Sequence, residues 1–251
     1  MTLREKVSSP EWQARCELAA LYRLIAHFKM TDMIDTHISL HVPGKFNHFL
    51  INKYGVLFEK MTASELVKID FDGNIVEEYE KNKKVNAAGF VIHSAIHQAR
   101  EDIRCIIHTH TSDGMAVSAQ KQGLLPLTQH ALKFYGNIGY HTYEGIALSL
   151  SERDRLVNDL GIHNAMILRN HGLLGAGKDI AWAFHEIYFL ERACQAQVKA
   201  LSGGGELVFP DEEVCRHAAL QFKRDGIDTI INDGWEAAKT FIDDQKESYC
   251  S

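Results

Sequence analysis

Two histidines lie one residue apart at the end of an apolar run, in the segment CIIHTHTSDG over 105–114. Successive residues of a strand point to opposite faces, so His108 and His110 project together from the strand expected over IRCIIHTH. A third histidine, His171, follows a second apolar run, AMILRN, and precedes a glycine that permits close approach of the backbone. Neutral imidazoles that converge in this way can bind one divalent metal ion.

A metal centre with three protein ligands keeps coordination positions open, which separates catalytic from structural sites. Zinc is the ion that we expect, with iron, manganese and cobalt as alternatives. An HxH pair alone is more often structural than metal-binding. The pair His171-Gly172 strengthens the metal interpretation, but the alternative, polar residues where a buried strand surfaces, stays open.

The composition limits the class of protein. The chain has 251 residues, of which 45% are hydrophobic and 24% charged, as in globular proteins with a sizeable core. Its net charge of -6 lacks the basic footprint of a nucleic-acid binder. No apolar run is long enough to span a bilayer, and the N-terminus is too polar for a secretory signal. Five scattered cysteines without a CxxC pair favour a reducing compartment, so we expect a cytoplasmic protein.

Short strands are predicted before the histidine pair. Ser9 as a capping residue, with Pro10 and Glu11 in the first turn, predicts a helix start. The segments THISLHVPG and HFLINKYGVLF predict two strands joined by a turn at 43–44. The segment VKIDFDGNIVEEY predicts a hairpin around 72–74.

Helices and strands alternate in the rest of the chain. Asn86 is the expected cap of a helix that carries His93, and the longest helix is expected over 179–201, with a core-facing stripe that ends at Leu201. We interpret AMILRNHGLLGAG as a strand that runs into a glycine-rich turn, and the tail from Pro210 as one or two helices. This pattern favours a single α/β domain with a mixed, mainly antiparallel sheet.

The runs VNAAGFVIHSAIHQAREDIRCIIHTHTSDGMAVSA, GLLPLTQHAL and ILRNHGLLGAGKDIAWAF resemble the class II aldolase/adducin family over roughly residues 12–205. VNAAGF and LPLTQHAL are similar to its adducin branch. The resemblance implies a three-layer α/β/α fold, with 1–251 as one domain and 206–251 as its helical extension. It also implies a homotetramer whose metal site lies near a subunit boundary. His108, His110 and His171 are then the three residues that bind the metal.

The chain departs from the sugar-phosphate aldolases of this family at the proton-transfer position. Those enzymes carry a glutamate four residues before the histidine that matches His93, and this position is Gly89 here. The serines that hold substrate phosphate are replaced by Ala87 and Ala88. The first phosphate loop, Gly-Asn-x-Ser in the aldolases, reads THIS here, and only Ser39 is retained.

A further departure concerns the proton-donating tyrosine of the aldolases, four residues after the proline that matches Pro126. This position is His130 here. An imidazole titrates near neutrality, so His130 is our candidate acid/base, and His93 is a candidate for orienting a ligand or relaying a proton. Further candidate substrate contacts lie on two segments: Ser39, Tyr135, Tyr140 and His141. Tyr140 and His141 have the alternative of serving only at the end of a strand.

The leading hypothesis is therefore a divalent-metal-dependent enzyme, a lyase, that acts on a small hydroxy or keto acid. General-base catalysis is commonly worth about 10²–10⁴-fold, so loss of the glutamate argues against a typical sugar-phosphate aldolase. C–C cleavage, decarboxylation and dehydration are the reactions that we consider.

Three alternatives remain. The protein could be a non-catalytic binding or assembly module like the adducin head. With ferrous iron it could be a non-haem oxygenase or oxidative decarboxylase, because three histidines leave room for both oxygen and substrate. A nucleotide-binding role has little support, because HGLLGAG lacks the Lys-Ser/Thr of a P-loop.

Overall fold

The computed structural model describes residues 2–146 and 149–251. Within them, seven strands form one sheet in the order β3-β2-β1-β4-β7-β6-β5. Neighbouring strands are antiparallel except β5 and β6, which are parallel. The strands are β1 (His37–His41), β2 (His48–Asn52), β3 (Leu66–Asp70), β4 (Cys105–Thr109), β5 (Gly139–His141), β6 (Ala165–Leu168) and β7 (Gly172–Gly177). The predicted mixed, mainly antiparallel sheet of an α/β fold is confirmed.

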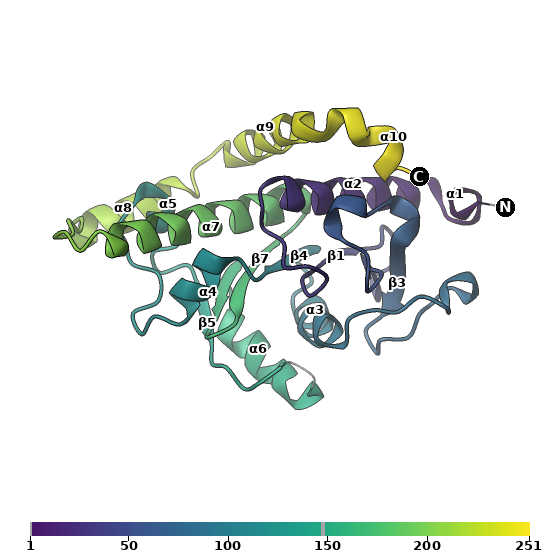
Figure 1. The fold of residues 1–251 in the computed structure, drawn as a ribbon, viewed down its shortest axis with the longest axis horizontal. Coiled ribbons are helices and arrows are strands. Elements are labelled where there is room, and N and C mark those ends of the chain that lie inside the picture. The colour runs from purple at the N-terminus through teal and green to yellow at the C-terminus, as the bar shows by residue number, and fades with distance from the viewer. Residues whose placement is uncertain (1, 147–148) are drawn as a thin grey trace.

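Helices cover both faces of this sheet (Figure 1). The α-helices are α1 (Leu3–Lys6), α2 (Ser9–His27), α3 (Ala87–Ala99), α4 (Ser112–Ser118), α5 (Gln129–Leu132), α6 (Arg153–Leu160), α7 (Ile180–Ser202), α8 (Glu212–Gln221), α9 (Ile227–Lys239) and α10 (Lys246–Tyr249). Short 3-10 turns are η1 (Phe58–Lys60), η2 (Ala63–Glu65), η3 (Glu78–Glu80), η4 (Leu150–Glu152) and η5 (Thr240–Gln245). No helix of the described residues is both long and apolar enough to span a bilayer.

Apolar clusters lie on both faces of the sheet. The larger core packs α2 and α7 against the sheet, and α9 adds a further layer outside α7 (Figure 1). A smaller core lies under α3 and α6. Burial of apolar side chains on both faces is the main force that holds these layers together.

Strand β1 is buried on both faces, but only one of them is apolar. Ile38 and Leu40 belong to the larger core. The alternate residues, His37, Ser39 and His41, face α3 instead, because successive side chains of a strand point to opposite faces. Polar side chains of the sheet therefore meet the helix that carries His93, next to the strand that carries His108.

The prediction of a glycine-rich turn after AMIL is wrong. Residues 172–177 form β7, which pairs with β6 and β4, and the turn lies at 169–171. The glycines serve close packing, since a Cβ on Gly177 would lie 2.5 Å from the backbone nitrogen of Ala183 in α7. The long helix packs directly on the backbone of β7.

Three smaller predictions need correction. The cap of α2 is Ser8, one residue before the predicted Ser9, and its hydroxyl accepts from the Glu11 amide at 3.3 Å. The hairpin around 72–74 has only an isolated bridge between Ile69 and Ile75. Leu201 is 40% exposed, because the end of α7 extends beyond the sheet (Figure 1).

Candidate metal centre

His108 is the most deeply placed of the three predicted ligands. It lies in β4 and is fully buried. Its Nδ1 lies 2.9 Å from the carbonyl oxygen of Leu173 in β7, so Nδ1 carries the proton and donates it. In a neutral imidazole the other nitrogen, Nε2, then has a free lone pair. The β4–β7 pairing thus fixes both the orientation and the tautomer of this ligand.

His110 follows β4 and is held by a carboxylate. Its Nδ1 lies 3.1 Å from Oδ2 of Asp32, in the segment between α2 and β1. Donation from Nδ1 to this carboxylate again leaves Nε2 free to bind a metal, as in the carboxylate–histidine pairs of metalloproteins. Asp32 is a member of the site that sequence reasoning missed.

His171 enters the site from the tight turn between β6 and β7. Asn170 adopts a left-handed conformation there, with φ 55°. A Cβ at Gly172 would lie 2.4 Å from the carbonyl oxygen of Thr109 and 3.1 Å from the His110 ring. The expectation that this glycine permits close approach of two backbones is confirmed.

The three Nε2 atoms converge on one point. Their separations are 2.8 Å from His108 to His110, 2.9 Å from His110 to His171 and 3.3 Å from His108 to His171. Nitrogen atoms that share one zinc ion at about 2.0–2.1 Å lie roughly 2.9–3.4 Å apart for octahedral to tetrahedral angles. Two of these atoms have lone pairs that face each other, so a cation fits this donor set better than a hydrogen-bonded cluster does.

The environment keeps the rings of His108 and His171 neutral, as metal ligation requires. Burial, followed by the neighbouring imidazoles, lowers the pKa of His108 well below its ordinary value. The same causes lower the pKa of His171 to about 4. His110 and His171 remain partly exposed, so the site is open to solvent on their side.

One predicted substrate contact, His141, lies in the wall of a narrow cleft beside His171. Tyr143 lines the same cleft, and its ring centroid is 6.5 Å from that of His171. The His141 ring lies between two carboxylates, with Nδ1 2.7 Å from Asp159 and Nε2 3.2 Å from Glu152. Its side chain is therefore already fully partnered, which fits a role in shaping the cleft.

Two further candidates, His93 and Ser39, lie on the side of His37 away from the solvent-exposed part of the predicted metal site. Both are fully buried. The Ser39 hydroxyl contacts His93 Nδ1 and, at 2.7 Å, His97 Nε2. His93 Nε2 lies 2.8 Å from Nδ1 of His37. The substrate and proton-relay roles predicted for this pair stay predictions, but their contacts are with other buried imidazoles.

The remaining candidates contact other parts of the fold. The His130 ring in α5 stacks on Phe189 of α7 at 4.9 Å between centroids. The Tyr140 hydroxyl accepts from the amide of Leu124 at 3.1 Å. Tyr135 is partly buried just after α5, and its carbonyl oxygen accepts from Asn137 at 3.0 Å. Their predicted roles at the metal stay predictions.

His37 is the second residue that sequence reasoning missed. The signal was present: HISLH alternates polar and apolar residues, and His93 and His97 stand four apart on a helix. Both patterns place imidazoles on a single face. Asp32 has no comparable signal, because it lies in an irregular segment far from His110 in sequence.

Residues 16–198 match the family model described as Class II Aldolase and Adducin N-terminal domain. A protein of Caulobacter vibrioides that is provisionally named an aldolase class 2 protein is 47% identical, over 99% of this chain and 96% of that protein. Alpha-adducin of Rattus norvegicus is 44% identical over 76% of this chain, but the match spans only 26% of adducin.

Solved structures agree with this assignment. An aldolase II superfamily protein from Pseudomonas syringae has a TM-score of 0.93 and 48% identity, and the match covers 100% of both chains. L-fuculose 1-phosphate aldolase from Glaciozyma antarctica has a TM-score of 0.82 and 26% identity, over 95% of this chain and 92% of that one. The fold, the sequence and the histidine constellation together show that the chain belongs to the class II aldolase/adducin family.

Proposed function

We propose that this protein is a divalent-metal-dependent enzyme that acts on a small hydroxy or keto acid by C–C cleavage, decarboxylation or dehydration. The observation that carries the proposal is the convergence of three Nε2 atoms within 2.8–3.3 Å of one another. Zinc is the expected ion. Bound there, it would supply Lewis-acid polarisation of a carbonyl, carboxylate or hydroxyl.

The residues around the site indicate which class of substrate it can bind. The Leu173 carbonyl and Asp32 hold two imidazoles in the tautomer that ligation needs. The exposed side of His110 and His171 admits a substrate, whereas Ala87 and Ala88 offer no hydroxyl to a phosphate group. A small unphosphorylated acid fits these features better than a sugar phosphate.

His130 remains the proposed acid/base, acting between subunits. In its own chain the ring stacks on Phe189, so we place its action at the metal centre of a neighbouring copy in a homotetramer. Light scattering should then give four times the 28.3 kDa of one chain. Mixed oligomers of His130→Ala and His110→Ala chains should regain activity that neither variant has alone. A monomer in solution excludes this role.

The experiment that tests the proposed function begins with metal content. Elemental analysis of the purified protein should find about one divalent ion per chain, lost in each alanine variant of the three histidines and retained in His217→Ala, an exposed histidine on α8. The protein reloaded with zinc, manganese, cobalt or ferrous iron is then assayed against hydroxy and keto acids. Activity confined to ferrous iron and dependent on oxygen would identify an oxidative decarboxylase instead.

The 44% identity to alpha-adducin favours one second candidate, a non-catalytic binding or assembly module. In that case the histidines would brace the fold or a subunit interface. Absence of metal from the isolated protein, together with a melting temperature unaffected by chelation, would support the module against the enzyme.

A further inference from the structure

The space beside Gly89 is already filled. Gly89 lies in the first turn of α3 and is buried. A Cβ built there would meet the His37 ring at 2.7 Å from Cδ2, 2.8 Å from Cγ and 3.2 Å from Nε2. Real Cβ atoms do not approach a ring this closely, so a side chain at position 89 and the present position of His37 exclude each other.

The His37 ring cannot easily move aside, because a chain of buried polar groups holds it. Its Nδ1 lies 2.8 Å from His93 Nε2, and the other nitrogen of His93 contacts the Ser39 hydroxyl, which also lies 2.7 Å from His97 Nε2. All four residues are at most 2% exposed. Each buried polar group that loses its partner costs on the order of 1–3 kcal/mol of folding free energy. Moving the His37 ring would break this chain, so the ring is held in place.

The His37 ring also contacts His108, one of the three predicted metal ligands. His37 and His108 are paired residues of β1 and β4, so their side chains lie on the same face of the sheet. Their ring centroids are 4.9 Å apart with an interplanar angle of 31°. The imidazole of His37 thus packs against both Gly89 of α3 and His108, the buried ligand of the candidate metal centre.

We propose that His37 is a positioning residue of the metal centre, which packs against His108 and occupies the space that a side chain at position 89 would need. The ion is then held by three imidazoles, and α3 contributes no acidic ligand. The coordination positions left open are available to oxygen atoms of the substrate. This inference deepens the proposed function and rests on it for the presence of the metal.

The steric part of the proposal is tested without any metal. In a helix, alanine is more favourable than glycine by about 1 kcal/mol. Gly89→Ala would therefore stabilise the protein if the space beside position 89 were free. We expect Gly89→Ala to lower the melting temperature of the native chain by several degrees, and to raise it when introduced into His37→Ala. Gly205→Ala, at a loop position with open space around it, is the control and should change little in either background. If Gly89→Ala has the same effect in both backgrounds, the two positions do not compete for space.

The positioning part is tested with cobalt, whose absorption spectrum reports ligand number and geometry. His37→Ala should weaken cobalt binding by about 10–100-fold, the usual effect of losing a residue that orients a ligand, and should shift the spectrum. His37→Phe keeps a ring against His108 but loses the bond to His93, and should recover part of the affinity. His41→Ala, two residues along the same strand, is the matched control and should match the native spectrum.

A gain-of-ligand variant completes the test. In the double variant His37→Ala/Gly89→Glu the carboxylate can enter the vacated space, so the cobalt spectrum should change again and the affinity should rise above that of His37→Ala. Gly89→Glu alone should not produce this spectrum. Native cobalt spectra and affinities in every folded His37 variant would overturn the positioning role. Failure of the native protein to bind cobalt would instead refute the proposed function, and the stability comparison would still decide whether His37 and position 89 compete.

Discussion

At the scale of single residues, histidine side chains serve two different purposes in this protein. Imidazoles whose Nδ1 donates to a fixed acceptor, His108 and His110, present a free Nε2 to the candidate metal. Imidazoles such as His93, which use both nitrogens inside the protein, act as hydrogen-bonded spacers. The two uses differ in whether Nε2 is free or is bound to another group of the fold.

This distinction predicts a role for Asp32. In Asp32→Ala, His110 loses the acceptor that fixes its tautomer, so zinc affinity should fall by about 10–100-fold. Asp35→Ala, an exposed aspartate of the same segment, should bind zinc like the native chain. Competition with a chromophoric chelator measures both. Equal affinity of the two variants would show that the carboxylate does not orient His110.

At the scale of elements, the site depends on how closely β4 and β7 approach each other. A methyl group on Gly172 would collide with the Thr109 carbonyl at 2.4 Å, and backbone atoms cannot give way as a flexible side chain can. The same two strands carry His108 and the carbonyl that orients it. A change in the distance between β4 and β7 would therefore also change the orientation of His108.

Gly172→Ala should accordingly reduce both stability and metal content. We expect a loss of about 1–3 kcal/mol of unfolding free energy, typical of overpacking, and less than full zinc occupancy in the folded protein. Urea unfolding and elemental analysis measure the two effects. A variant with native stability and a full complement of zinc would show that the strands can separate without cost.

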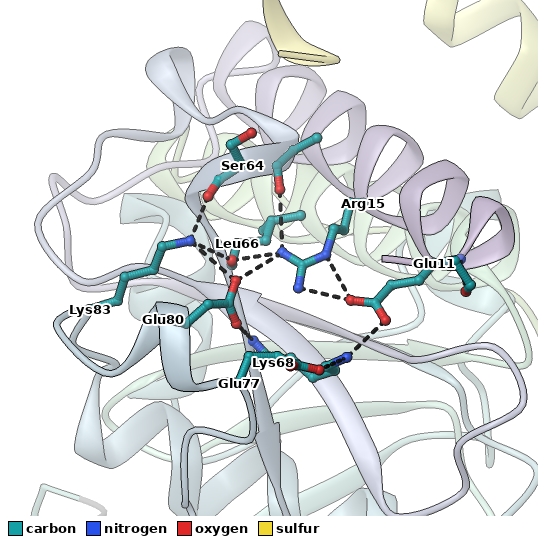
Figure 2. A network of polar contacts seen from close by, with 10 residues as sticks. Glu11, Arg15, Ser64, Leu66, Lys68, Glu77, Glu80 and Lys83 are labelled. Atoms are coloured by element: carbon teal, nitrogen blue, oxygen red, sulfur yellow. Dashed lines mark hydrogen bonds and ion pairs between the residues drawn. The ribbon is translucent and has the colours of Figure 1, made fainter. Parts of the chain in front are cut away.

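A network of buried ion pairs connects α2 to β3, an edge strand of the sheet (Figure 2). Arg15 of α2 is fully buried and pairs with Glu11 at 3.0 Å and with Glu80 at 3.3 Å. Glu80 also accepts from the Lys68 amide of β3 at 2.9 Å, and Lys83 lies 3.3 Å from it. Carboxylates and cationic side chains alternate along this network. The attraction between neighbours offsets the free energy that each loses when it is removed from water.

Removing one member should therefore cost more than removing a surface charge. In Glu80→Ala, Arg15 and Lys83 lose a buried counter-ion, and we expect a loss of about 3–5 kcal/mol in urea unfolding. Arg216→Ala breaks an exposed pair with Glu212 and should change stability little. A small effect of Glu80→Ala would mean that water enters the network and replaces the carboxylate.

At the scale of the whole molecule, burial of histidines links stability to pH. Burial lowers the pKa of His41 to about 4 and of His185 to about 3, and lowers the pKa of His93 and His97 well below the ordinary value. In the unfolded chain these groups titrate near 6.5. Between these limits the unfolded state binds more protons than the folded state, so stability rises with pH there.

The free energy of unfolding should therefore be nearly constant between about pH 7 and about pH 8 and fall steadily from about pH 6.5 towards pH 4.5. His185→Phe keeps a ring against Phe189 but cannot titrate, so its curve should be flatter than that of the native chain. Urea unfolding at several pH values measures both curves. Parallel curves would assign the acid sensitivity to other groups.

The sequence by itself determined the α/β class, the strand that carries His108 and the helix capped by Asn86, because each follows from local alternation or capping. It placed His108 and His110 on one face at a strand end, but their meeting with His171 depends on the pairing of β4 with β7. The tertiary structure decided the rest. The β6–β7 hairpin, the bond from Asp32 to His110 and the placement of His37 against Gly89 all depend on strand register and helix packing between segments distant in sequence. Such contacts follow from the summed burial of many side chains, and no local pattern encodes them.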